Sequence, residues 1–365
     1  MTLELKNVSL HDGVEQLVLD LNAKFETGMN ILLGPTLAGK TTTMRLIAGL
    51  MKPDEGEITL NGQDLSKVEV RNRSVAFVYQ QFINYPSFSV FDNIASPLRV
   101  AKDKMSKSEI KDRVEEVAEL LGLTPFLQRK PSALSGGQQQ RVAIARALSR
   151  KSDVVLLDEP LANLDYKLRE QLREELQNIF SDSDSVVIYS TAEPAESMYF
   201  SVPTFVMNEG QIIQRGSALD IYQAPESIFS AKAVSDPPIN LLSAKHEDNS
   251  LSLAGAVFKR AEIQDALAHA SEFTLGIQPH DLHQEKIPNA VEITGVVQLA
   301  EVTGSSTFVH VRLKSNEDLV VELDGAHPMN PGIEYTIYFD PARIYAFDNQ
   351  TKKTLGFPER LVANG

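Results

Sequence analysis

The chain has 365 residues, and its 35 lysines and arginines against 49 aspartates and glutamates give a formal net charge of −14. At about 100–200 residues per domain this length predicts two domains, and 42% hydrophobic residues are enough to fill their cores. The sequence contains no cysteine, which excludes disulfides, thiolate metal sites and cysteine nucleophiles and is typical of a reducing compartment.

The charge and the apolar pattern also restrict the partners. A charge of −14 disfavours a nucleic-acid partner. The first residues lack the basic and apolar segments of a secretory signal, and the apolar runs are far shorter than the ~20 residues that span a bilayer. Taken alone, these features predict a soluble cytoplasmic protein.

The predicted elements alternate between strands and helices over the first part of the chain. Apolar residues alternate along the opening segment, which favours strands, and the apolar run Ile31–Leu33 predicts a strand that leads through a glycine-containing turn into a helix. Apolar spacing predicts further helices over residues 102–121, 139–150 and 166–180, with a buried parallel strand at Val154–Leu157. This alternation predicts an α/β fold.

The pattern changes near Asp236-Pro237-Pro238. Beyond it, short alternating runs punctuated by glycine and proline predict a small all-β barrel or sandwich. We therefore expect a first domain over residues 1–235 and a second over residues 236–365. The second part holds 10 lysines and arginines against 18 aspartates and glutamates, a net charge of −8, so phosphate-backbone binding is disfavoured there too.

The turn after the first predicted parallel strand matches the pattern G-x-x-x-x-G-K-[ST]. In this pattern, backbone N–H groups and a helix N-terminus bind phosphate oxygens, Lys40 reaches the β- and γ-phosphates, and the Thr41 hydroxyl binds Mg²⁺. The pattern predicts ATP and Mg²⁺ as ligands. The residues expected to hold the nucleotide here are Gly34, Pro35, Thr36, Leu37, Ala38, Gly39, Lys40, Thr41 and Thr42.

A second motif supplies the carboxylates. The strand at Val154–Leu157 is followed by Asp158 and Glu159, and the two-residue period of a strand places these side chains on opposite sides. We expect Asp158 to hold Mg²⁺ and Glu159 to act as the general base on an attacking water.

A third motif, Ser135-Gly136-Gly137-Gln138, opens the helix predicted over residues 139–150. A serine and two glycines at a helix start form another anion-binding N-terminus. Two such sites in one domain suggest that two chains sandwich the nucleotide, each supplying one of them.

In order, the motifs GPTLAGKT, VYQQF, LSGGQQQR, VVLLDEP and LANLD (Leu161–Asp165) resemble those of the ATP-binding-cassette (ABC) ATPases. The resemblance implies that Gln80 contacts Mg²⁺ and water and senses the transmembrane partner. It implies that Ser135 and Gly137 contact the γ-phosphate bound on the opposite subunit, and that Asp165 lies in a loop that connects the two sites. Residues 83–150 would form a helical subdomain whose groove accepts a coupling helix of a permease.

This resemblance also implies partners and a location. They are a second ABC ATPase chain, two transmembrane permease subunits and, indirectly, a periplasmic solute-binding protein, at the cytoplasmic face of the bacterial inner membrane. Aromatic residues crowd the segment after Gln80, as core residues or as a patch for the coupling helix: Phe82, Tyr85, Phe88 and Phe91.

The C-terminal part narrows the resemblance. LGIQPHDL (Leu275–Leu282) and FDPARIYAFD (Phe339–Asp348) look like the OB-like β-barrel extension of carbohydrate-importer ATPases of the maltose and glycerol-phosphate type, which implies a regulatory or dimerising domain. The segments QQFINYPSFSVFDNIASPLRV and TAEPAES are most similar to an ATPase chain of the bacterial glycerol importer, which uses two different ATPase chains. The alternative within transport is a sugar or glycerol-3-phosphate importer.

The chain departs from the family pattern at three positions. Ala192 stands where a switch histidine is usual, Asp12 where a tyrosine or tryptophan stacks on adenine, and Leu37 where glycine is preferred. His11 could stack in place of the missing aromatic, or lie in a surface turn. All three departures fall on the chain's own nucleotide site while LSGGQ is intact, so we expect a heterodimer, with a homodimer as the alternative, and slow hydrolysis at this site. Alternatives of another class are a catalytically weak regulatory subunit and a non-transport ABC ATPase.

Overall fold

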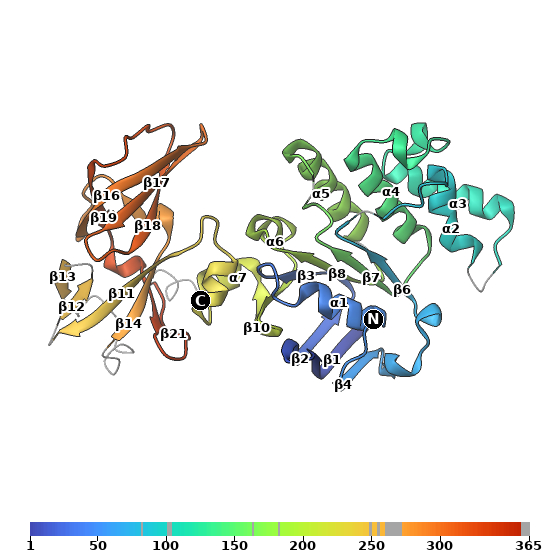
Figure 1. The fold of residues 1–365 in the computed structure, drawn as a ribbon, viewed down its shortest axis with the longest axis horizontal. Helices are drawn as coiled ribbons and strands as arrows, with labels where there is room; N and C mark the ends of the chain where they lie inside the picture. The colour runs from blue at the N-terminus through green and yellow to red at the C-terminus, as the bar shows by residue number, and fades with distance from the viewer. Residues whose placement is uncertain are drawn as a thin grey trace. The chain divides into compact units, whose positions relative to one another are not determined.

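The computed structural model describes residues 1–81, 83–100, 104–162, 164–181, 183–247, 250–253, 256–259 and 272–358. The contacts divide the chain into two compact units, Met1–Arg215 and Gly216–Gly365 (Figure 1).

The first unit is built on two sheets. An antiparallel sheet has the order β2-β1-β4-β5 and consists of β1 (Thr2–Asp12), β2 (Glu15–Glu26), β4 (Glu55–Leu60) and β5 (Gln63–Asp64). A six-stranded sheet has the order β10-β9-β3-β8-β7-β6 and consists of β3 (Gly28–Leu33), β6 (Val75–Val78), β7 (Val154–Asp158), β8 (Val186–Thr191), β9 (Pro203–Asn208) and β10 (Gln211–Ser217). Strands β3, β6, β7, β8 and β9 run parallel, and β7 and β8 are buried along their whole length, as expected of central parallel strands.

Among the residues that the structure describes in this unit, the sheets are accompanied by the helices α1 (Lys40–Ala48), α2 (Val90–Arg99), α3 (Lys107–Leu120), α4 (Gly136–Ser149), α5 (Tyr166–Phe180) and α6 (Pro194–Phe200). Helices α2, α3 and α4 gather in one group inserted between β6 and β7 (Figure 1). Side-chain caps fix where four helices begin, because Ser89, Ser106, Ser135 and Asp165 each accept a backbone N–H of the first turn. The helix predicted over 166–180 is confirmed at those bounds. Short 3-10 helices cover Leu65–Lys67, Val70–Asn72, Thr124–Phe126 and Pro131–Ala133.

The second unit is mainly β, as its alternating sequence predicts. One sheet has the order β13-β12-β11-β14-β20-β21: β11 (Asn240–Glu247), β12 (Ser250–Leu253), β13 (Ala256–Lys259), β14 (Glu272–Ile277), β20 (Tyr345–Asp348) and β21 (Thr354–Gly356). The other has the order β15-β19-β16-β17-β18: β15 (Leu282–His283), β16 (Val291–Val302), β17 (Ser306–Leu313), β18 (Asp318–Asp324) and β19 (Glu334–Phe339). Inward-facing residues of both sheets share one apolar core. Short 3-10 helices cover Pro279–Asp281 and Pro341–Arg343.

Two short helices open the second unit, α7 (Ala218–Gln223) and α8 (Ile228–Ala233). Ile228 packs in one apolar cluster with Ile239 and Phe347, so this helix belongs with the β-sheets that follow it. The compact units therefore divide at residue 215, and the sequence-based boundary at residue 235 stays a prediction. Among the described residues, no helix is both long and apolar enough to cross a membrane.

Candidate nucleotide-binding site

Strand order brings the first two sequence motifs together. Strands β3, β8 and β7 are parallel neighbours, so their carboxyl ends meet at one edge of the sheet. The loop Gly34–Gly39 follows β3, and Glu159 follows β7 at the same edge. Crevices at the carboxyl ends of parallel strands are the usual ligand sites of α/β folds.

The loop between β3 and α1 wraps around an ammonium group. Lys40 is only 4% exposed, and its Nζ donates to the carbonyl oxygens of Gly34 (2.7 Å) and Pro35 (2.9 Å). Packing requires glycine at residue 34 of this loop, because a Cβ there would lie 2.2 Å from the carbonyl oxygen of Met207. The other predicted residues of this loop divide by exposure: Ala38 is buried, Gly39, Thr41 and Thr42 are half-buried, and Pro35, Thr36 and Leu37 are exposed.

Asp158 is almost completely buried, at 2% exposure, and this burial raises the pKa of its carboxyl group. The Thr41 hydroxyl lies 3.0 and 2.9 Å from the two carboxylate oxygens, and Ser190 Oγ donates to Oδ1 over 2.8 Å. Mg²⁺ is usually bound through one or two carboxylates together with substrate phosphates and waters. Thr41 and Asp158 therefore fit the ion that accompanies a nucleotide.

Glu159 lies just beyond β7 with a φ of +44°, so it leaves the strand geometry. Its carboxylate pairs with Lys40 Nζ at 3.1 Å and accepts a hydrogen bond from Gln80 Nε2 at 2.9 Å. The prediction that Asp158 and Glu159 point to opposite sides stays a prediction. The two carboxylates have different partners, since Asp158 bonds to Thr41 and Ser190. Both carboxylates contact residues of the first turn of α1.

The sequence motifs did not identify Ser190, although it contacts both of these acidic residues. Besides bonding to Asp158, its Oγ accepts the backbone N–H of Glu159 at 3.0 Å. The sequence signal is weak, because the strand Val186–Thr191 opens with three apolar residues and ends with three residues that all carry a hydroxyl.

The third motif forms a separate group. Ser135 caps α4 in a capping box with Gln138, with N–H to oxygen distances of 3.0 and 3.3 Å. Gly137 is buried against α5, where a Cβ would lie 1.8 Å from Leu168 Cδ2, while Gly136 is exposed. Asp165 caps α5 by accepting the Leu168 N–H at 3.1 Å. Within the described part of the chain, no hydrogen bond joins these residues to Lys40, Thr41, Asp158 or Glu159. Asn163 of the LANLD motif lies outside the described residues.

The three departures from the family pattern lie at the surface. Ala192 is exposed just after β8, and Leu37 is 96% exposed with a φ of +67°. Asp12 is exposed at the end of β1, and the neighbouring His11 is held by Asp54, whose Oδ2 accepts the His11 backbone N–H at 2.8 Å and lies 3.3 Å from Nδ1.

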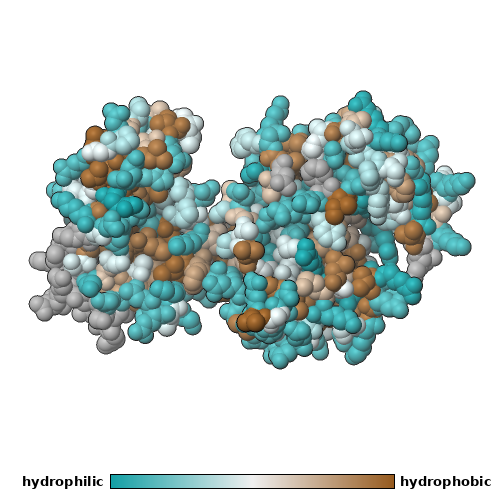
Figure 2. All heavy atoms as spheres, in the orientation of Figure 1, coloured by the Kyte–Doolittle hydropathy of each residue, from teal (hydrophilic) through white to brown (hydrophobic). Residues whose placement is uncertain are grey.

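The segment after Gln80 exposes apolar surface. Ile83, Tyr85 and Phe88 are 53%, 46% and 40% exposed, and Arg146 lies over the Tyr85 ring at 5.0 Å. Phe82 lies outside the described residues, and Phe91 is half-buried. On the face drawn in Figure 2, apolar side chains are interspersed with hydrophilic ones in both units. Permease docking at Ile83–Phe88 stays a prediction.

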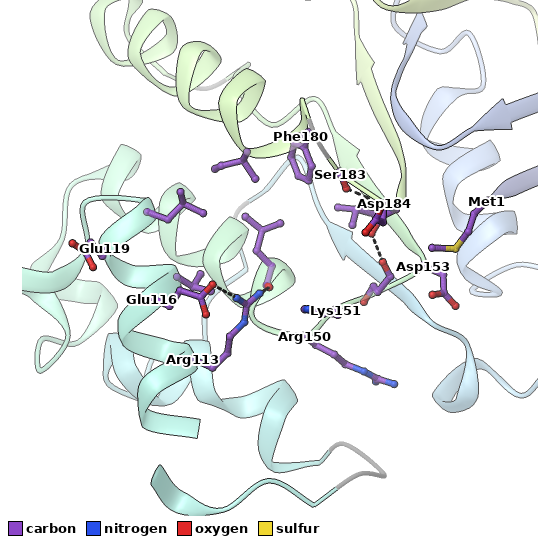
Figure 3. Close-up of a pocket in the computed structure, with 17 residues that line it drawn as sticks. Met1, Arg113, Glu116, Glu119, Arg150, Lys151, Asp153, Phe180, Ser183 and Asp184 are labelled. Carbon is purple, nitrogen blue, oxygen red and sulfur yellow. Dashed lines mark hydrogen bonds and ion pairs between the residues drawn. The ribbon is translucent and has the colours of Figure 1, made fainter. Parts of the chain in front are cut away.

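A cavity of about 670 Å³ lies elsewhere in the first unit, between α3, the end of α5 and the amino ends of β7 and β8 (Figure 3). Arg113, one of the cations that line it, donates to the carbonyls of Leu148 (2.8 Å) and Ser149 (3.0 Å) and pairs with Glu116 (2.7 Å). The residues that suit phosphate chemistry lie instead at the opposite ends of these strands.

Comparisons with known proteins give matches to families, to relatives and to solved structures. The ABC transporter family model matches residues 18–162, and the TOBE domain model matches residues 275–347. The chain is 35% identical over 354 residues to the oligosaccharides import ATP-binding protein MsmX of Bacillus subtilis, covering 94% of this chain and 96% of that protein. It is 38% identical over 342 residues to the trehalose/maltose import ATP-binding protein MalK of Thermococcus litoralis, covering 89% and 91%. A solved dimeric ATP-binding cassette, in a post-hydrolysis state with ADP and Pi, matches with a TM-score of 0.53 and 28% identity over 59% of this chain and 98% of that one.

Proposed function

Because the chain belongs to the ABC transporter family, as an ATP-binding subunit with a C-terminal TOBE domain, we propose that it energises solute import through a membrane permease. ATPases of this family bind ATP with Mg²⁺ and couple its hydrolysis to transport. The observation that carries the proposal is the convergence of Lys40, Thr41, Asp158, Glu159 and Gln80 at one edge of the parallel sheet.

The contacts of Lys40 suggest how the site prepares for hydrolysis. Lys40 is paired with Glu159 across 3.1 Å in a site where both groups are largely shielded from water. Nucleotide phosphates compete for the same ammonium, and charge-assisted hydrogen bonds to phosphate are strong. Phosphate binding would therefore release Glu159 from Lys40, and Glu159, still within reach of Gln80, would accept a proton from water. Mg²⁺ bound at Thr41 and Asp158 would neutralise developing phosphate charge.

Exchange of Glu159 for glutamine tests this assignment. Glu159→Gln should retain ATP binding, measured with a fluorescent ATP analogue, and should lose hydrolysis in the assembled transporter. Lys40→Ala is the comparison, because it removes the phosphate-binding cation and should reduce ATP binding itself. Unchanged hydrolysis in the Glu159 variant would remove this residue from the mechanism.

We further propose that the chain works as a heterodimer with a second ATPase chain and that its own composite site is slow. Ala192 cannot hydrogen-bond a phosphate or a water through its side chain, and the loss of a positioned acid-base group costs about 10²–10⁴ in rate. The motif expected to complete the partner's site is intact in contrast, with Ser135 exposed at the start of α4. The test compares ATP turnover by the chain alone with turnover by the chain mixed with the second ATPase. Brisk turnover by a homodimer would contradict the proposal, and Ala192→His should accelerate a slow site.

As the transported solute we propose glycerol. The support is the similarity of residues 80–100 and of TAEPAES to an ATPase chain of the two-ATPase glycerol importer. The names of MsmX and MalK, which import oligosaccharides and trehalose or maltose, favour a sugar importer as the second candidate. No residue of this chain needs to touch the solute, since an ATPase chain supplies energy and the permease supplies the pathway.

Uptake by intact cells separates these candidates. Deletion of the gene should abolish accumulation of labelled glycerol at low external concentration while uptake of labelled maltose and trehalose continues. Loss of sugar uptake with normal glycerol uptake would favour the second candidate. Two permease subunits and a solute-binding protein are expected to co-purify with the chain from the membrane fraction, with the chain on the cytoplasmic face.

A further inference from the structure

Ser190 is placed by strand register beside the acidic end of β7. Asp158 pairs directly with Ser190 in the parallel register of β7 and β8. Ser190 is fully buried, its Oγ donates to Asp158 Oδ1 over 2.8 Å, and the same oxygen accepts the Glu159 N–H at 3.0 Å. The Ser190 carbonyl oxygen also accepts this N–H, at 3.2 Å. One hydroxyl therefore connects the two acidic residues of the site.

Residues on the opposite face of β8 are also held by hydrogen bonds. Tyr189 and Thr191 point away from Ser190, as the two-residue period requires. The Tyr189 hydroxyl donates over 2.8 Å to Oε2 of Glu196, which is 4% exposed, and Thr191 Oγ1 accepts the Glu193 N–H at 3.0 Å. Because both faces of the strand end are tied to buried groups, Ser190 Oγ has a fixed position relative to Asp158.

The second hydroxyl that bonds to the Asp158 carboxylate, that of Thr41, is expected to change its partner when the nucleotide binds. Thr41 lies 2.9–3.0 Å from both carboxylate oxygens, and it is also the hydroxyl expected to bind Mg²⁺ when the nucleotide arrives. When Thr41 turns to the ion, Ser190 is the side-chain donor that still holds Asp158 among the described contacts. Groups that orient a metal-binding carboxylate typically contribute about 10–100-fold to metal affinity.

We propose that Ser190 is a positioning residue that holds the Asp158 carboxylate in its Mg²⁺-binding orientation. This inference rests on the proposed function, which assigns Asp158 to the ion of MgATP. It adds a residue that none of the sequence motifs contains.

The test measures ion dependence rather than turnover. The full chain is titrated with Mg²⁺ in the presence of a fluorescent, non-hydrolysable ATP analogue, and the Mg²⁺ concentration at half-maximal binding is recorded. Ser190→Ala should raise that concentration by about 10-fold or more, with the affinity for the Mg²⁺-free analogue unchanged. The matched control is Ser197→Ala, which removes an equally buried hydroxyl that donates to the Pro194 carbonyl at 2.7 Å and does not contact Asp158.

Two further outcomes would overturn the inference. If Ser190→Ala has the Mg²⁺ midpoint of the Ser197 control, or if it weakens Mg²⁺-free binding to the same extent, Ser190 has only a structural role. Asp158→Asn separates this failure from that of the proposed function. If Asp158→Asn leaves the Mg²⁺ midpoint unchanged, Asp158 does not hold the ion and both proposals fail; if it shifts the midpoint and Ser190→Ala does not, only the Ser190 inference fails.

Discussion

Leu37 allows the geometry of the phosphate loop to be tested through stability. The residue has a φ of +67° and is 96% exposed, so its left-handed backbone is not compensated by packing of its side chain. This conformation costs an L-residue about 1–2 kcal/mol, whereas glycine adopts it freely but loses about 0.5–1 kcal/mol more chain entropy on folding. Leu37→Gly should therefore change the free energy of unfolding by about 0 to +1.5 kcal/mol. Leu37→Val should destabilise, because a β-branched residue tolerates positive φ poorly.

The assay is urea unfolding of the full chain followed by far-ultraviolet circular dichroism. The transition of residues 1–215 is recognised as the one that ATP moves to higher urea, since a ligand that binds the native state stabilises it. The reasoning is refuted if Leu37→Gly loses more than about 1 kcal/mol, because the side chain would then be making contacts that its exposure excludes. Equal stability of the valine and leucine proteins would refute the left-handed backbone.

Three further changes probe other contacts of the first unit. Gly34→Ala places a Cβ 2.2 Å from the Met207 carbonyl oxygen, so it should lower unfolding free energy by about 1–3 kcal/mol and weaken binding of the ATP analogue. Arg113→Lys loses the fork that donates to two backbone carbonyls at the end of α4, which should cost about 1–3 kcal/mol in urea unfolding without altering ATP affinity. Burial raises the pKa of the Glu196 carboxyl group above its ordinary 4.5, so the folded chain holds that proton more tightly than the unfolded chain does. The free energy of unfolding should therefore fall as the pH rises from the unfolded-state pKa through the folded-state pKa. Glu196→Gln should flatten this fall when urea midpoints are measured over a series of pH values.

The grouping of Lys40, Thr41 and Asp158 could be predicted, because each motif is a run of consecutive residues and because adjacent parallel strands end at one edge of the sheet. The spacing of Gly34, Lys40 and Thr41 predicts a phosphate loop from eight consecutive residues. The prediction that Asp158 lies beside Thr41 needed only the assumption that the strands leading to these residues, β7 and β3, share a sheet. In the structure, Thr41 Oγ1 lies 2.9 Å from Asp158 Oδ2. The two-residue strand period does not define the orientation of Glu159, because this residue follows β7 and has a positive φ.

Ser190 and Arg113 could not be predicted in the same way. Ser190 meets Asp158 across 32 residues of sequence, and only the register of β7 against β8 makes them partners. A shift of one residue would have turned the Ser190 hydroxyl to the other face of the sheet. Arg113 lies on a predicted amphipathic helix, where an arginine ordinarily faces solvent, yet it closes the carbonyl end of α4. Both contacts depend on tertiary geometry that leaves no local pattern.

The burial or exposure of each position in the chain's own nucleotide site indicates whether this site is slow or does not function. Gly34 and Lys40 are buried among backbone atoms, so substitution there would disturb packing as well as ATP binding. Leu37 and Ala192 are exposed, so substitution there would leave the buried contacts of Lys40 in place. The departures from the family pattern fall on these free positions, while the buried contacts of Lys40, Thr41 and Asp158 are complete. This supports a site that still folds and binds MgATP but lacks a group that accelerates the chemical step. Retained analogue binding with slow turnover, restored in part by Ala192→His, is the combination that such a site requires.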